Sequence, residues 1–397
     1  MPETHRSRSQ PIAWLYVGFA LTGVGTTLLG CILPALIRDW HLDDRGAGVL
    51  FAAQFMASAL GALLVRSDFF RSLVTGYALL IASAVSLTLF VGSANVLLFF
   101  AFGLGLGLTM TATNMLVSRT FWGNRGAALS ILNAVWGLGA VLTPAVASLW
   151  IGHGSPTYLY LPLAAALTLT LLVTGVSREA FVAESRNLPE DDGEHRSVEL
   201  VSIFAAIAFL YVGTEVSVSG WMMTYVGRLP ISGRAWSPIA ASCFWGALIL
   251  GRTLVPAVMR RLTEAQLLTS TLAIAFLSVL LLLLTHAPVA IILSAALLGL
   301  VLGPVFPLCL SRVLALMHNS ADSKWVFASS GLGAALLPWL TGQVSAHSGS
   351  LRVGLLVPVF ALGTMIILDR LGGGGRLSYG GVLSTQDRVH DPAHGKS

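Results

Sequence analysis

The sequence has little charge and few cysteines. Asp, Glu, Lys and Arg make up only 10% of its 397 residues, whereas a soluble domain carries about 25%. The three cysteines, Cys31, Cys243 and Cys309, show neither CxxC spacing nor pairing with histidine, which predicts no disulfide and no metal site. No nucleophile–base pair is recognisable either. The lack of charge excludes a soluble domain, and nothing in the sequence supports an enzyme or a bound cofactor.

A nucleotide-binding loop is missing as well. The glycines of Phe102-Gly-Leu-Gly-Leu-Gly107 have no strand before them and no Lys-Ser/Thr pair after them, both of which a phosphate-binding loop requires. Small residues in a membrane helix more often let two helices approach closely. We therefore interpret this run, and the related segments 137–144 and 331–338, as sites of packing or bending.

Long apolar runs fill most of the chain, of which 55% is hydrophobic. About 20 consecutive apolar residues are enough to cross a bilayer as a helix, and twelve such runs are separated by charges or Gly/Pro clusters. The predicted spans are 12–36, 46–65, 72–92, 95–118, 126–150, 157–177, 199–226, 236–258, 265–285, 288–316, 323–346 and 350–369. The first run has no small-residue cleavage site, so we expect a retained helix rather than a signal peptide.

The two halves of the chain repeat each other. Leu15-Tyr-Val-Gly18 recurs as Leu210-Tyr-Val-Gly213, 195 positions later, and the Gly-Leu-Gly-Ala motif at 137 recurs at 331, 194 positions later. Six spans per half give both repeats the same orientation, an arrangement in which substrate binds between the halves near the membrane midplane. The fold class predicted is thus an all-α membrane protein with twelve transmembrane helices in two six-helix bundles.

The predicted organisation follows from the longest polar stretch between spans. The expected parts are a first bundle at 1–177, a cytoplasmic linker at 178–198, a second bundle at 199–370 and a disordered cytoplasmic tail at 371–397.

Basic residues are distributed unevenly over the two sides of the predicted membrane. Of 23 Lys and Arg, 18 lie on the side of both termini and five on the other, so the positive-inside rule places both termini in the cytoplasm. We expect a monomer surrounded by lipid in a bacterial inner membrane. The net charge of +5 then reflects topology, and no nucleic-acid partner is expected.

One carboxylate, Glu215, lies well inside a predicted span. An ionised side chain at this depth is costly unless it is paired or faces a polar cavity. Two interpretations remain open. Glu215 is either a substrate or coupling-ion site, which exchanges H⁺ or binds Na⁺ with nearby hydroxyls such as that of Ser219, or a protonated acid bonded to a neighbouring helix.

Other polar and aromatic residues at membrane depth supply further candidates. Ser130, Asn133 and Trp136 recur every three residues and share one helix face. Amides supply donors and acceptors and indole rings supply flat apolar faces, and a sugar presents both kinds of surface. The predicted substrate-binding residues are Gln54, Asn114, Ser130, Asn133, Trp136, Tyr211, Glu215, Trp221 and Trp245. The alternatives are that the amides bond helix to helix and that Trp221 anchors at the membrane interface.

Charged residues also follow the second span and end the eighth. Asp68 and Arg71 occupy a place equivalent to that of Arg252 on the cytoplasmic side. They are either ordinary positive-inside charges or ion pairs of a cytoplasmic gate.

Twelve spans, a tandem repeat and these basic loops resemble the major facilitator superfamily. Within it the chain resembles the fucose permease group of sugar:cation symporters and its sodium-dependent glucose relatives. The telling segments are Leu-Leu-Gly-Cys-Ile-Leu-Pro34, Gly-Leu-Thr-Met-Thr-Ala-Thr-Asn114, Ala-Leu-Ser-Ile-Leu-Asn-Ala-Val-Trp-Gly137 and Gly-Pro-Val-Phe-Pro307. The resemblance retains the amides Asn114 and Asn133, but puts Gly30 and Met110 where that group has its two acids.

The resemblance implies an alternating-access transporter for a small neutral sugar or polyol, coupled to H⁺ or Na⁺. With Gly30 and Met110 in place of the acids, Glu215 is the remaining candidate for coupling. An efflux carrier for amphipathic compounds is the alternative, since abundant Gly, Phe and Met suit such a substrate. A third interpretation, in which the protein transports nothing, is a membrane sensor or a structural scaffold.

Overall fold

The computed structural model describes residues 3–90, 94–121, 125–151, 153–176, 198–230, 233–309 and 323–373, and it is helical almost throughout. All of the predicted linker but its last residue, most of the predicted tail and the end of the tenth predicted span lie outside these residues. The helices are α1 Glu3–Asp39, α2 Asp44–Leu63, α3 Phe69–Leu89, α4 Ala94–Thr120, α5 Arg125–Trp150, η2 Pro156–Leu159, α6 Tyr160–Val176, α8 Val198–Gly227, α9 Gly233–Val258, α10 Glu264–Leu284, α11 Pro288–Leu302, α13 Ser323–Ser348, α14 Leu351–Gly354 and α15 Leu356–Gly373.

Local sequence explains several helix starts. Asp43 and Asp68 accept hydrogen bonds from backbone N–H groups in the first turns of α2 and α3, which satisfies donors that a helix start leaves unpaired. Thr263 and Gln266 form a reciprocal capping box at the start of α10. Pro288 opens α11, where its fixed φ suits the first turn.

Within the described residues, eleven helices are long and apolar enough to cross a membrane. The twelfth long helix is α13, whose polar residues make it less hydrophobic. These residues face its neighbours: Ser329 donates to the Ala205 carbonyl of α8, and Ser345 donates to Asp44 of α2. The prediction of an all-helical membrane fold with twelve long helices is confirmed.

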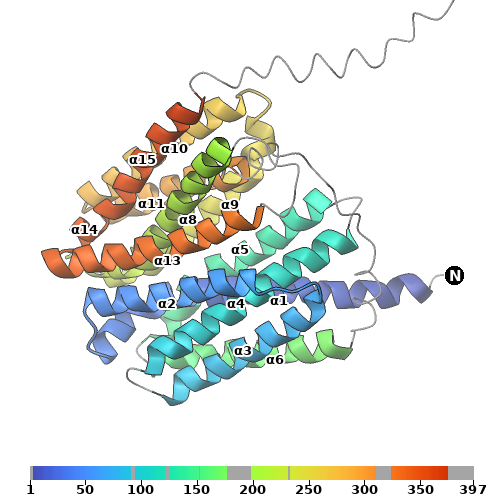
Figure 1. The fold of residues 1–397 in the computed structure, drawn as a ribbon. Helices are drawn as coiled ribbons and strands as arrows, with labels where there is room; N and C mark the ends of the chain where they lie inside the picture. The colour runs from blue at the N-terminus through green and yellow to red at the C-terminus, as the bar shows by residue number, and fades with distance from the viewer. Residues whose placement is uncertain are drawn as a thin grey trace, which may run out of the picture.

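The helices form two groups, α1–α6 and α8–α15, which appear as the blue-to-green and the green-to-red parts of Figure 1. Within each group the repeat is visible in the packing. A Cβ atom on Gly139 of α5 would lie 2.2 Å from the Ala20 carbonyl oxygen of α1, and one on Gly333 of α13 would lie 1.9 Å from the Phe209 carbonyl oxygen of α8. Equivalent glycines therefore join equivalent helices.

The glycine run of α4 also serves packing. A Cβ atom on Gly103 would lie 1.9 Å from the Gln54 carbonyl oxygen of α2, and one on Gly105 would lie 2.9 Å from the Gly76 carbonyl oxygen of α3. Helix α4 is thereby held against both neighbours at backbone distance, as small residues permit in membrane bundles.

Three pairs of helices connect the two groups. Helix α13 lies along α2 (Figure 1), α8 crosses α1, and α9 packs on α5. The crossing of α1 and α8 is tightest at two glycines, since a Cβ atom on Gly30 would lie 2.9 Å from the Cα atom of Gly220. The described residues thus bring α1, α2 and α5 of the first group against α8, α13 and α9 of the second.

The glycine contacts predict a position-specific effect on stability. Gly103→Ala should lower the free energy of unfolding by about 1–3 kcal/mol, the usual cost of overpacking a filled interface. Gly246→Ala is the matched control, because a Cβ atom there would meet nothing within 4 Å. Unfolding by SDS in mixed micelles measures both, and an equal effect of the two substitutions would contradict the packing role.

Candidate functional site

Glu215 is paired rather than isolated. The Arg252 Nη2 atom of α9 lies 3.2 Å from its Oε2 atom, and the Tyr211 hydroxyl, one turn earlier on α8, donates to the same oxygen. The side chains of Glu215 and Arg252 are only 9% and 22% exposed. An acid and a base buried together make a neutral unit, which costs far less than either charge alone.

The pair belongs to the second bundle. Arg252 also lies 3.5 Å from the Tyr211 hydroxyl, and the Tyr211 ring stacks on Phe306 at a centroid distance of 6.0 Å. The Nε atom of Arg252 is buried and has no hydrogen-bond partner among the described residues. Glu215 is thus bonded to a neighbouring helix, and the partner that α9 supplies carries the opposite charge. Its role as a substrate or coupling-ion site stays a prediction.

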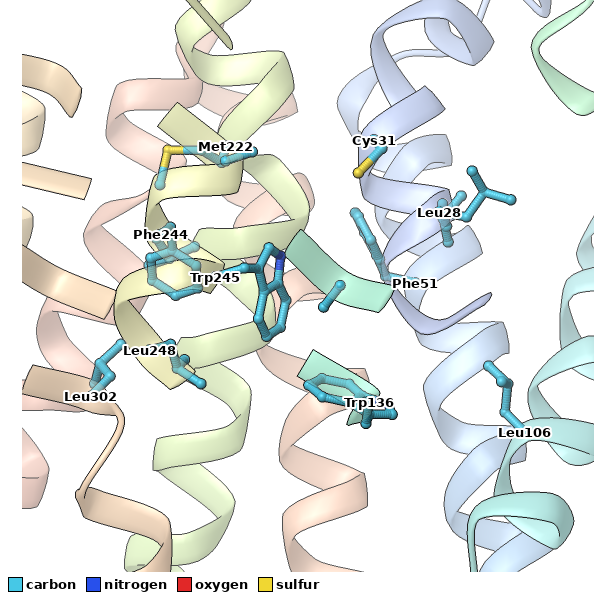
Figure 2. Close-up of a cluster of buried hydrophobic side chains, with 14 of the residues drawn as sticks. Leu28, Cys31, Phe51, Leu106, Trp136, Met222, Phe244, Trp245, Leu248 and Leu302 are labelled. Carbon is cyan, nitrogen blue, oxygen red and sulfur yellow. The ribbon is translucent and has the colours of Figure 1, made fainter. Parts of the chain in front are cut away.

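Trp136 and Trp245 bring the two bundles into contact. Their rings, from α5 and α9, meet edge to face at 5.5 Å, an arrangement that aromatic quadrupoles favour. Figure 2 shows them within a cluster of buried apolar side chains that includes Phe51, Phe244 and Leu248. The Trp136 Nε1 atom is buried and lacks a hydrogen-bond partner in the described part of the chain.

The predicted amides bond locally. The Asn114 and Asn133 amides donate to the carbonyl oxygens of Met110 and Leu129, four residues back on the same helices, at 2.9 and 2.8 Å. Asn133 and Ser130 are exposed and Asn114 is half-buried. Neither amide joins two helices in the described residues, which removes the simplest argument for a purely structural role.

Gln54 differs from these amides. It is fully buried on α2 and donates across to the Thr26 carbonyl oxygen of α1 at 3.3 Å. This contact is the helix-to-helix bond that the sequence left open. Its Oε1 atom has no partner among the residues described, so a ligand role for Gln54 stays a prediction.

Trp221 is buried between helices and does not reach the outer surface of the protein. It is 0% exposed, packs on Phe51 of α2 at 5.7 Å and donates its Nε1 proton to the Pro338 carbonyl oxygen of α13 at 3.1 Å. The alternative of an interfacial anchor is therefore wrong. The ring instead joins three helices, two from the second bundle and one from the first.

Only two of the three predicted gate residues, Asp68 and Arg71, lie close together. Asp68 caps α3 by accepting from the Arg71 N–H at 2.9 Å, and their side chains, 49% and 82% exposed, are 3.8 Å apart. Arg252 pairs instead with Glu215. A cytoplasmic gate at these residues stays a prediction. The contact that the structure shows for Arg252 is the one with Glu215.

Two further buried acids were missed from the sequence. Asp44, at the start of α2, pairs with Arg228 just after α8, and Asp369 near the end of α15 accepts from the Thr269 hydroxyl at 2.6 Å. Both lie close to helix ends, where sequence alone favours an exposed charge. Arg228 is one of only five basic residues predicted on the side away from the termini. A basic residue that is rare on its side of the membrane was the available signal for a paired charge.

The structure also explains the two missing acids. Gly30 lies at the crossing of α1 and α8, where any side chain would meet the Gly220 backbone. Met110 of α4 faces Thr26 of α1, whose hydroxyl lies 4.0 Å from its sulfur atom. The first position has no room for a carboxylate in this conformation, and the second is filled by an apolar side chain.

Comparison with known proteins identifies the family. The model of the Major Facilitator Superfamily matches residues 15–338. The chain belongs to the Major Facilitator Superfamily. It is therefore a secondary transporter and an integral membrane protein that acts on a small molecule, and the expectation that it is not an enzyme is confirmed.

Distant relatives of this major facilitator are sugar transporters. A glucose/galactose transporter of Brucella abortus biovar 1 (strain 9-941) is 24% identical, with 86% of this chain and 91% of the relative covered. The glucose/mannose transporter GlcP of Bacillus subtilis (strain 168) is 22% identical, covering 82% and 86%. The resemblance to the fucose permease group also holds.

Solved structures show the same fold. The transporter FucP in the outward conformation gives a TM-score of 0.62 at 15% identity, with 92% of this chain and 99% of that chain covered. A peptide transporter POT in complex with sulfate gives 0.72 at 15% identity, covering 96% and 95%. These similarities establish the architecture. The substrate has to be inferred from the residues of this chain.

Because Glu215 and Arg252 are buried together, we expect the removal of either charge alone to destabilise the protein. Arg252→Met should lower the free energy of unfolding by about 3–5 kcal/mol, because it strands the Glu215 carboxylate, whereas adding Glu215→Met should restore most of the loss. Arg71→Met, in the exposed pair, should cost about 0–1 kcal/mol. Unfolding in mixed micelles tests all three, and equal effects of Arg252→Met and Arg71→Met would refute the buried pair.

Proposed function

We propose that this major facilitator moves a small neutral sugar or polyol together with a coupling cation, H⁺ or Na⁺, across a bacterial inner membrane. The observation that carries the proposal is the contact between Trp136 and Trp245. These rings come from different bundles, lie in the middle of their helices and leave the Trp136 indole donor free within the described residues. A sugar ring stacks on indole and takes its N–H donor.

Polar groups on α5 complete the argument. Asn133 and Ser130 lie about one and two turns before Trp136 on the same face, and both are exposed. A polyol offers many hydroxyls to such groups, and the distant relatives named for glucose, galactose and mannose transport agree with this substrate class. The apolar cluster around the two tryptophans favours the alternative, an efflux carrier for amphipathic compounds.

Transport assays separate these substrates. In proteoliposomes we expect uptake of labelled glucose or galactose, and Asn133→Ala should weaken sugar binding about five- to 150-fold, because a buried hydroxyl without its partner costs roughly 1–3 kcal/mol. Ser148→Ala is the control, since this half-buried residue lies 15 positions, or roughly 22 Å, along the same helix. Transport of a labelled lipophilic cation, with no sugar uptake, would establish the efflux carrier instead.

Glu215 is proposed as the coupling residue, with Arg252 as its charge partner. Accumulation against a gradient requires a group whose ligation differs between states, since a ligand shifts an equilibrium only through differential affinity. Protonation of Glu215, or binding of Na⁺ to it, competes directly with the 3.2 Å contact to Arg252. Occupancy of Glu215 is thereby linked to the packing of α8 on α9.

Replacing Glu215 should uncouple transport. Glu215→Gln should abolish uphill uptake but retain sugar counterflow, because exchange needs only the loaded carrier to change state. The double variant Glu215→Gln with Arg252→Gln guards against misfolding caused by an unpaired guanidinium. Both measurements are made on the same vesicles: full uphill uptake by either variant would rule out coupling through Glu215, and loss of sugar binding would make it a substrate ligand.

A further inference from the structure

A second ion pair joins the two bundles at one end of the molecule. The Arg228 Nη1 and Nη2 atoms lie 2.8 and 2.6 Å from the two carboxylate oxygens of Asp44, and the Ser345 hydroxyl donates to the same carboxylate. Asp44 comes from α2 of the first bundle. Arg228 directly follows α8, and Ser345 lies near the end of α13, both in the second bundle. The carboxylate is thus held from both helices of the opposite bundle that face it.

The position of each charge adds to the attraction. Asp44 lies in the first turn of α2, where the helix dipole favours an anion, and Arg228 follows the last turn of α8, where it favours a cation. The Asp44 side chain is 10% exposed and that of Arg228 is 43% exposed. A two-pronged contact to a largely buried carboxylate is stronger than an exposed surface pair.

Close backbone contacts surround this ion pair. A Cβ atom on Gly342 of α13 would lie 2.4 Å from the Asp44 carbonyl oxygen, and one on Gly48 of α2 would lie 3.0 Å from the Trp339 carbonyl oxygen. Further along, α1 and α8 approach closely at Gly30 and Gly220. A Cβ atom added to Gly30 would lie 2.9 Å from the Cα atom of Gly220. The bundles therefore meet here at backbone distance, with no space between these residues for a solute.

All these residues lie at the same end of the bundles. Helix α1 ends there, α2 begins there, and α8 and α13 end there, on the side opposite the start of α1. The count of basic residues predicts that this is the outer side. An alternating-access carrier must part its bundles at this end once per cycle.

We propose that Asp44, Arg228 and Ser345 form a latch that holds the carrier closed at this end and must break before it opens there. The latch is present in one state and absent from the other, so its interaction energy biases the equilibrium between them. This inference is independent of the substrate, because it concerns only the balance between the two conformations of the empty carrier.

Spin-label distances in the reconstituted full-length protein test the latch. One label pair, at Arg38 and His347, reports on the latch end, and a second pair, at Ser67 and Arg261, reports on the other end; all four residues are exposed. The three native cysteines are replaced by alanine in this background. Asp44→Asn and Arg228→Gln are then compared with the parent, with Arg45→Gln as the matched control from the same turn of α2.

Both latch variants should shift the latch-end distances to longer values and the opposite-end distances to shorter ones. The ratio of open to closed molecules at the latch end should rise about tenfold, as a two-state equilibrium does on losing roughly 1.4 kcal/mol. Arg45→Gln should leave both distributions unchanged, and Ser345→Ala should act in the same direction as Asp44→Asn but less strongly. Folded Asp44→Asn and Arg228→Gln proteins with the parent's distances would overturn the proposal.

Discussion

A charge inside a low-dielectric membrane protein needs an opposite charge beside it, and this constraint organises the described structure. Glu215 finds Arg252 on the next helix of its own bundle, and Asp44 finds Arg228 in the other bundle. The first pair is internal, so it can respond to a proton or an ion without moving the bundles apart. The second pair spans the bundles, so it exists only while they touch. We therefore propose different residues for chemical coupling and for mechanical closure.

Much of the fold was predictable because helix formation in a bilayer depends on local hydrophobicity. Most of the predicted spans agree with the helices within a few residues; for example, 126–150 was predicted and α5 is Arg125–Trp150. The exceptions are α1, which begins at Glu3 rather than at 12, and α11, which ends at Leu302 inside the predicted span 288–316. The repeat was also sound, since Gly139 and Gly333 make equivalent contacts in the two bundles. Local pattern and global arrangement agree here because the motifs that recur at offsets of 194 and 195 lie on the same pair of helices in each bundle.

The site was less predictable because pairing depends on how helices are rotated and crossed. Glu215 was conspicuous in the sequence, but Arg252 lies 37 positions away, in a motif typical of a loop signature. Asp44 and Arg228 are 184 positions apart, and nothing local relates them. Trp221 likewise has its partner at Pro338. Residue type and depth indicated which side chains were unusual, while tertiary packing decided what each one contacts.

Helix α13 has the least reason of the twelve long helices to enter a bilayer by itself. Its described part is less hydrophobic than the spans before and after it. Its hydroxyls bond to α2 and α8, which precede it in the chain. Insertion of a weakly hydrophobic segment is favoured when polar groups already in the membrane can receive it. Because α13 follows both α2 and α8 in the chain, its contacts with them can form only after both halves have supplied a partner.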